Sequence, residues 1–134
     1  MEYTFFPLKE FCVNVGIQAG HDGHIALSSS DSQDASPIIE IFLGGWENQK
    51  SAIRVNREKP DKVQADTANI LSEGKETKFS IKWNTDGDVN VYEVGGSEPF
   101  LSWKNDAPFA ITHFGLKTSW GASGDWKIDG MQTI

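Results

Sequence analysis

Alternation of apolar and polar residues is the feature of this sequence that most constrains its fold. Every second residue is apolar over 11–17 and again over 79–83. A period of two is typical of a strand with one buried face. The segment Thr85–Asp88, which contains Gly87, has the composition of a hairpin turn, and the alternation resumes at 89–91. These segments therefore predict paired antiparallel strands.

The same pattern recurs in short segments along the whole chain. Further strands are predicted at 3–8, 24–29, 38–43, 51–55, 62–66, 100–103, 111–117 and 125–133, with turn residues between them. No segment places apolar residues at helical spacing over three turns, and the best candidate, 67–73, suffices for one turn. Many short strands at close spacing predict a single all-β domain over residues 1–134, an antiparallel β-sandwich of jelly-roll-like type.

Charge and composition exclude several classes of function. The net charge is −7 and no basic cluster occurs, so nucleic acid is not an expected partner. No apolar segment approaches the ~20 residues of a membrane helix, so membrane insertion is not expected either. Met1 is not followed by a basic and then a long apolar segment, so no signal peptide is predicted. We expect a soluble protein, cytoplasmic or secreted by a non-conventional route.

Few residues suit metal or catalytic chemistry. His21-Asp22-Gly23-His24 has two histidines three apart, but a metal needs further ligands, and a turn leading into a strand is the preferred interpretation. The acidic pairs 31/34 and 86/88 lack the run of oxygen ligands typical of a calcium site. The sequence therefore predicts no cofactor and no catalytic residue, with calcium as a secondary alternative.

The five tryptophans fall into two groups. Trp83, Trp103 and Trp126 are each in phase with apolar residues of a predicted strand, which places them in the core. Trp46 follows two glycines and precedes four mostly polar residues, and Trp120 lies among small residues. These two rings are predicted to be partly exposed.

An exposed indole beside polar side chains suits a sugar. The apolar face of a pyranose packs on an aromatic ring, while amide, carboxylate and guanidinium groups bind its hydroxyls. Arg54 is out of phase with Ile53 and Val55, and His24 with Ile25, so both are expected to face away from the core. The candidate ligand-binding residues are Trp46, Glu47, Asn48, Arg54, Asp22, His24 and Trp120.

Three sequence blocks, taken together, resemble one known domain family. They are GHDGHIALSSS (20–30), IIEIFLGGWENQKSAIR (38–54) and PFLSWKND with ITHFGLKTSWGASGDW (99–126). In this order and spacing they are similar to the domain family named after the farnesoic acid O-methyltransferase of arthropods. The resemblance extends from about Phe11 to Ile128. It implies a module that also occurs in invertebrate proteins with lectin-like or defence roles.

The function expected from these observations is non-enzymatic carbohydrate binding. The partners would be glycans or glycoconjugates, with galactose-type sugars favoured, and a shallow site would gain avidity if the protein formed a homo-oligomer. The family name implies an alternative, methyl transfer from S-adenosylmethionine to farnesoic acid. No helix is predicted after the glycine pairs 44–45 or 95–96, where a typical methyl-donor site would need one. A protein–protein interaction module is the third alternative.

Overall fold

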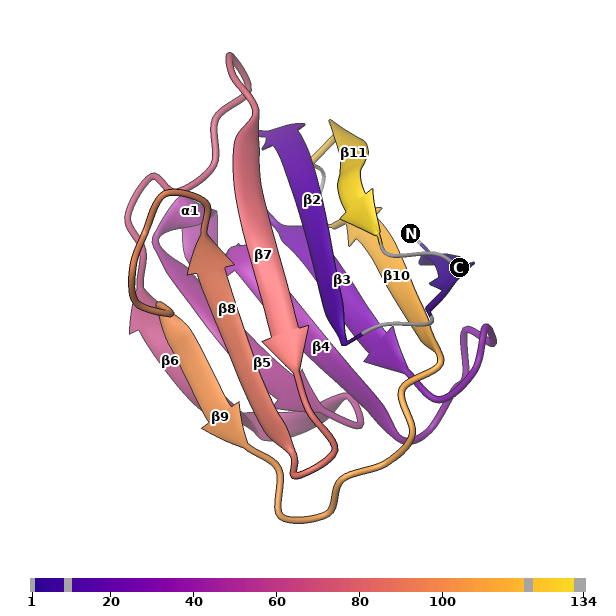
Figure 1. Cartoon of the computed structure of the whole chain (residues 1–134). Helices are drawn as coiled ribbons and strands as arrows, with labels where there is room; N and C mark the ends of the chain where they lie inside the picture. The colour runs from indigo at the N-terminus through magenta and orange to yellow at the C-terminus, as the bar shows by residue number, and fades with distance from the viewer. Residues whose placement is uncertain (1, 9–10, 120–121, 132–134) are drawn as a thin grey trace.

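Two antiparallel β-sheets are stacked on each other in the computed structural model of this protein, which describes residues 2–8, 11–119 and 122–131 (Figure 1). In spatial order, sheet A contains β1 (Thr4–Pro7), β10 (His113–Thr118), β3 (Gly23–Ser28), β4 (Ile38–Gly44), β5 (Lys50–Val55) and β6 (Glu58–Asp66). Sheet B contains β11 (Gly124–Met131), β2 (Cys12–Ala19), β7 (Thr77–Trp83), β8 (Asp88–Glu93) and β9 (Leu101–Lys104). A single turn, α1 (Gly45–Asn48), joins β4 to β5.

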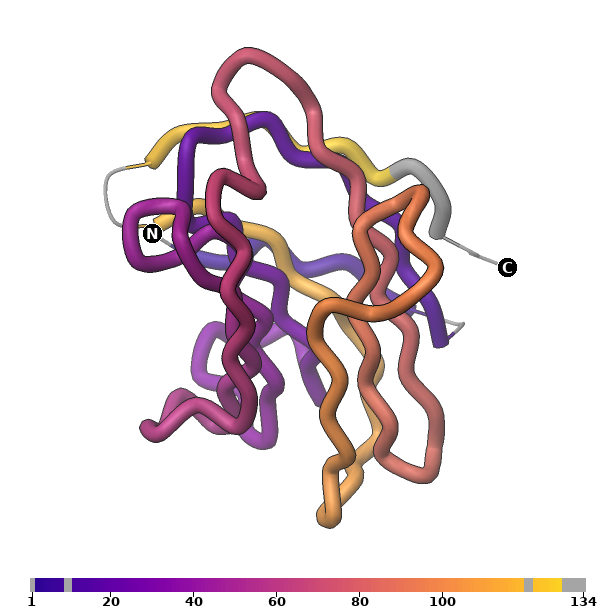
Figure 2. The backbone as a smooth tube through the Cα atoms, turned by 90° about the vertical axis from the view of Figure 1, so that its left-hand side faces the viewer, coloured from indigo at the N-terminus to yellow at the C-terminus, as the bar shows by residue number. Residues whose placement is uncertain are grey.

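The core fills the space between the sheets, which Figure 2 shows from the side. The inward-facing residues are those that the alternation predicted, for example Ile17 on β2 and Ile25 on β3, both fully buried. Trp83 is buried in this core, while Trp103 and Trp126 are partly buried against it. The predicted all-β sandwich is therefore confirmed.

The observed strands differ from the predicted ones in a few places. The strand predicted at 62–66 begins at Glu58, because the chain turns at Asn56 and Arg57 and not over 58–61. Both turn residues have positive φ (53° and 60°), as a two-residue hairpin turn requires. Residues 67–73 form no helix. Phe11, predicted to lie within a strand, precedes β2 and is exposed. Residues 132 and 133 of the last predicted strand lie outside the described residues.

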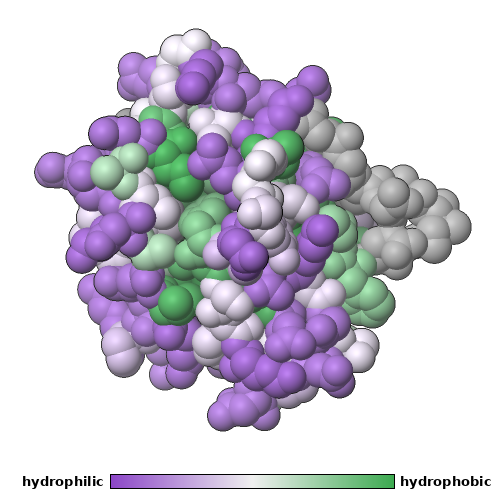
Figure 3. All heavy atoms as spheres, turned by 60° about the vertical axis from the view of Figure 1, so that its left-hand side comes forward, coloured by the Kyte–Doolittle hydropathy of each residue, from purple (hydrophilic) through white to green (hydrophobic). Residues whose placement is uncertain are grey.

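The edges of the two sheets come together at β6 and β9. Figure 3 brings this side forward and shows a largely hydrophilic surface with apolar atoms visible in hollows. Partly buried apolar residues of these strands, Val63 and Trp103, pack against the core. No helix in the described part of the chain is long and apolar enough to cross a bilayer.

The outer face of sheet A is covered, unlike that of an ordinary two-layer sandwich. An antiparallel sheet with one face in solvent alternates between buried and exposed residues. Every residue of β3 and β4 is instead buried, including Glu40 at 6% exposure and His24 at 5%. Side chains from several segments must therefore wall in this face, and they define the candidate site.

Candidate ligand-binding cavity

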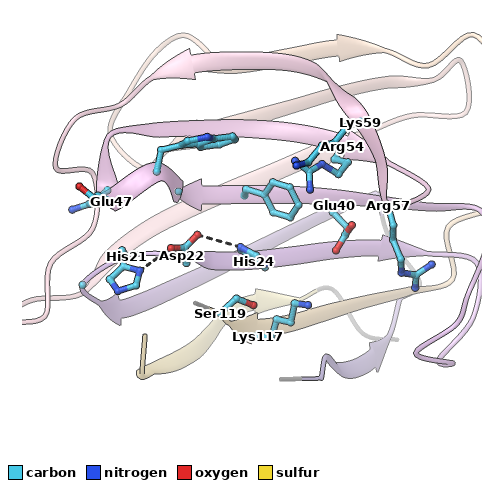
Figure 4. A pocket seen from close by; sticks show the side chains of 15 residues that line it. His21, Asp22, His24, Glu40, Glu47, Arg54, Arg57, Lys59, Lys117 and Ser119 are labelled. Carbon is cyan, nitrogen blue, oxygen red and sulfur yellow. Dashed lines mark hydrogen bonds and ion pairs between the residues drawn. The ribbon is translucent and has the colours of Figure 1, made fainter. Parts of the chain in front are cut away.

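A cavity of about 930 Å³ lies over the outer face of sheet A. It is lined by Gly20, His21, Asp22, His24, Glu40, Phe42, Gly45, Trp46, Glu47, Asn48, Arg54, Arg57, Lys59, Lys117 and Ser119 (Figure 4). These residues come from β3, β4, β5, β6 and β10, from α1, and from the turns that join them. The size is within the range of small-molecule sites.

Strand register brings the residues of the cavity floor together. Lys117 of β10 pairs with His24 of β3, which pairs with Phe42 of β4. The rings of His24 and Phe42 are 4.4 Å apart between centroids, and the guanidinium of Arg54 lies 4.7 Å from the centre of the Phe42 ring. Next to these residues in the sheet, Glu40 of β4 is the register partner of Arg54 of β5. The floor is therefore one aromatic ring surrounded by polar and charged groups.

Tyr3 closes one part of this face. The Tyr3 side chain passes over Gly115, where an added Cβ would lie only 3.0 Å from it, so a larger residue there would push against Tyr3. The Tyr3 hydroxyl donates to Glu40 Oε2 at 2.9 Å. Gln33 binds both the N–H and the C=O of Tyr3, at 3.0 and 2.8 Å. Burial, and then the Glu40 carboxylate, raise the pKa of Tyr3 well above its ordinary value, so the hydroxyl stays a donor.

Asp22 connects the two histidines of the His21–His24 segment. Its Oδ2 is 2.7 Å from His21 Nδ1, and its Oδ1 is 3.6 Å from His24 Nε2. Burial, and then the positive charges of Lys117 and Arg54, together lower the pKa of His24 from 6.5 to about 3. The His24 imidazole is therefore neutral at physiological pH, and it can both donate and accept a hydrogen bond.

Trp46 projects from a left-handed turn. Trp46, Glu47 and Asn48 have φ of 52°, 61° and 65°, a conformation that costs ordinary residues roughly 1–2 kcal/mol each. The Asn48 side chain offsets part of this cost, because its amide donates to Leu71 O at 2.8 Å and accepts from Leu71 N at 3.1 Å. Trp46 itself is 45% exposed. Strain of this kind concentrates at functional sites.

The cations of the cavity have different partners. Arg54 donates from Nε to Asp61 Oδ1 at 2.6 Å. Arg57 donates to the main-chain oxygens of residues 35 and 33, at 2.7 and 2.5 Å. The Lys117 ammonium lies 4.4 Å from the centre of the Tyr3 ring. The cavity therefore carries positive charge that carboxylates neutralise only in part.

Six of the seven candidate residues from the sequence line this one cavity: Asp22, His24, Trp46, Glu47, Asn48 and Arg54. Arg54 and His24 lie on the outer face, as the alternation predicted. Asp22 and His24 are buried at its floor, and the Asn48 amide is engaged by Leu71. Trp120, the seventh, lies outside the described residues. That these side chains bind a ligand stays a prediction.

Several lining residues were missed by sequence reasoning: Glu40, Phe42, Arg57, Lys59, Lys117 and Ser119. Glu40 alone carried a usable signal, since it is a charged residue in the middle of an apolar strand. Lys117 becomes part of the site only because β10 pairs with β3, which a single sequence does not reveal.

The sequence left metal binding open at His21–His24 and at the acidic pairs 31/34 and 86/88. No group of three or more His, Cys, Asp or Glu side chains placed to hold a metal occurs within 2–8, 11–119 and 122–131. In the hairpin after β7, Asn84 Nδ2 donates to Asp88 Oδ2, and the N–H groups of Asp86 and Asp88 donate to Asn84 Oδ1. These acidic residues therefore shape a turn.

Solved structures with a similar fold include two galectins. A tetrameric galectin from the ball sponge Cinachyrella sp. has a TM-score of 0.60 and 12% identity, with 97% of each chain covered. A variant of human galectin-16 has a TM-score of 0.58 and 10% identity, with 96% of this chain and 99% of that chain covered. A native glycosidic hydrolase has a TM-score of 0.54 and 13% identity, with 88% of this chain and 55% of that one covered. These likenesses show a galectin-like β-sandwich.

No curated protein matches the sequence. The family model described as farnesoic acid O-methyltransferase matches residues 1–132, which is nearly the whole chain and includes all three blocks that carried the resemblance. The chain therefore belongs to the farnesoic acid O-methyltransferase domain family.

Proposed function

We propose that this protein is a lectin that binds carbohydrate without transforming it, in the cavity on the outer face of sheet A. The observation that carries the proposal is Trp46, an indole held 45% exposed by a left-handed turn at the cavity that also contains Asp22, His24 and Arg54. A ring kept in solvent at a cost in backbone strain requires a reason, and a stacking ligand supplies one.

The lining groups suit the chemistry of a pyranose. Its apolar C–H face would pack on the Trp46 indole. Its hydroxyls need both donors and acceptors, which the neutral His24, the Asp22 carboxylate and the Arg54 guanidinium provide in the same cavity. Two of the similar solved structures are galectins, which supports a glycan as the ligand class. Galactose-type sugars are the favoured ligands within the proposal.

Oligomerisation belongs to the same proposal. A wide site that contacts one or two sugar rings gives weak binding per copy, and a homo-oligomer raises avidity by presenting several copies. The ball-sponge galectin of similar fold is tetrameric. Size-exclusion chromatography with light scattering measures the state of this protein directly, and a strict monomer would contradict this part.

A glycan array with Trp46→Ala beside the wild type tests the proposal. The variant should lose glycan binding by more than about tenfold while its free energy of unfolding changes by less than about 1 kcal/mol, because the ring is half exposed. Phe11→Ala is a matched control, since Phe11 is an exposed aromatic residue outside the cavity. A wild-type protein that binds no glycan would contradict the proposal.

The family description favours a second candidate, methyl transfer from S-adenosylmethionine to farnesoic acid. A cavity of about 930 Å³ could hold either molecule. The described residues contain no helix longer than the four-residue turn α1, so a helix N-terminus for the methyl donor would have to come from elsewhere. Isothermal titration with the donor decides the matter: micromolar binding would favour the enzyme over the lectin.

A further inference from the structure

Charge is unevenly distributed in the cavity. Figure 4 shows Glu47, His21 and Asp22 toward one end, and Arg54, Arg57 and Lys59 toward the other, with Lys117 beside the floor. Four cationic side chains and three carboxylates line the cavity of a protein whose net charge is −7. Positive charge has therefore been gathered at one end of this cavity on an otherwise acidic molecule.

The carboxylates at the cationic end are already engaged. Glu40 accepts the hydroxyl of Tyr3 at 2.9 Å and is 6% exposed. Asp61 accepts from Arg54 at 2.6 Å and from Gln64 at 2.9 Å. Each of these acids is therefore already held by side-chain hydrogen bonds, and neither forms an ion pair with Arg57, Lys59 or Lys117 within the described residues.

Three cations at this end lack a carboxylate partner within the described residues. Lys117 is half-buried and lies over the Tyr3 ring, but it forms no ion pair there. Arg57 uses two of its nitrogens to bind main-chain oxygens, which fixes the guanidinium without neutralising it. Lys59 is exposed on β6 and likewise forms no ion pair in this part of the chain.

Positive charges that lack anionic partners and face a cavity favour an anionic ligand. Charge-assisted hydrogen bonds from Lys and Arg to a carboxylate or sulfate are about twice as strong as neutral ones. The gain is greatest where a pocket wall excludes water.

We infer that the preferred ligand is an acidic saccharide, with a sugar ring on Trp46 and a carboxylate or sulfate at the end formed by Arg57, Lys59 and Lys117. This inference rests on the proposed lectin function. It deepens that function by dividing the cavity into a part that stacks a neutral ring and a part that binds an anion. A cavity of this volume accommodates more than one pyranose.

Two matched ligand pairs test the inference by isothermal titration with the whole protein. One pair is trigalacturonic acid and its methyl ester, in which esterification removes the negative charge of each carboxylate. The other is a sulfated galactan oligosaccharide and its desulfated twin. We expect one acidic member, or both, to bind about tenfold more tightly than its neutral twin, and to lose that advantage at high salt. The more strongly favoured pair identifies the anion.

Lys117→Gln should remove most of this preference, because it should weaken binding of the acidic twin much more than binding of the neutral twin. Lys82→Gln is the matched control, because Lys82 also lies over a tyrosine ring, that of Tyr92, but on the opposite sheet. Equal binding of the acidic and neutral twins would overturn the inference and leave the lectin function intact. Failure of both twins, and of every glycan on an array, would overturn both.

Discussion

The outer faces of the two sheets are built from similar strands but differ in what they bury. On sheet B, β7 alternates buried and exposed or half-buried residues from Thr77 to Trp83, as a solvated sheet should. On sheet A, β3 and β4 are buried on both faces, and their outer residues include the ionisable side chains of His24 and Glu40. Burying such groups costs free energy unless they are hydrogen-bonded, so the outer face of sheet A carries a cost that the partly solvated face of sheet B does not.

The difference arises from what lies above each sheet. Outward residues of sheet B bind each other across strands, as Ser102 does to Asn90 at 2.7 Å, and these two residues are exposed or half-buried. Sheet A is covered at one end by Tyr3, at another by the turn that carries Trp46, and at its side by Arg57. The outer face of sheet A forms the floor of a cavity here because these segments surround it.

Removing the aromatic floor of the cavity should have the largest effect on stability. Phe42 is 7% exposed and contacts both His24 and Arg54, so Phe42→Ala should lower the free energy of unfolding by about 3 kcal/mol or more. Tyr92→Ala, at a half-buried outer position of sheet B, should cost about 1 kcal/mol. Urea denaturation measures both. Equal losses would show that the two faces are packed alike.

The pH dependence of the free energy of unfolding should give the second-largest effect, because it depends on the buried His24 of sheet A. His24 is neutral in the native state down to about pH 3, whereas in the unfolded chain it binds a proton below about pH 6.5. Its contribution is therefore fully present above about pH 6.5 and is lost as the pH falls toward 3. Between about pH 7 and about pH 4.5 this amounts to about 3 kcal/mol.

Urea denaturation of the wild type and of His24→Asn at both pH values isolates this contribution. The variant will be less stable at neutral pH, because it alters the floor, but its stability should fall less on acidification. The difference between the two pH values is the quantity to compare, since the carboxylates titrate in both proteins. An unchanged difference would show that His24 is not held neutral by burial.

Changes in the turn that carries Trp46 should give the smallest of the three effects on the free energy of unfolding. Asn48→Ala removes both hydrogen bonds to Leu71 and places alanine at a φ of 65°, so we expect a loss of about 2 kcal/mol. Asn48→Gly removes the same bonds without the left-handed strain and should cost about 1 kcal/mol less. If both variants are equally stable, the strain attributed to this turn is absent. Binding by both should weaken, because Trp46 loses its support.

Much of the cavity could be predicted from the sequence, because the features that place these residues depend on their neighbours along the chain. Whether a residue faces the core or the outside of a strand depends on its phase, so Arg54 and His24 were placed correctly from their neighbours. The exposed position of Trp46 followed from the glycines before it and the polar residues after it. Glu40 and Lys117 were missed, because their roles depend on which strands are adjacent and in what register.

The sequence by itself therefore determined most of the strands, the side of each that faces the core, and the family to which the chain belongs. Only the tertiary structure decided that Tyr3 crosses Gly115 to reach Glu40 and that the Asn48 amide donates a hydrogen bond to Leu71. The same holds for the cations, which come from three separate strands or turns and meet at one end of the cavity. Alternation depends on neighbouring residues, whereas these contacts join residues far apart in the sequence; Tyr3 and Glu40, for example, are 37 positions apart. Their formation depends on the order and register of strands, which are set by the packing of the whole chain.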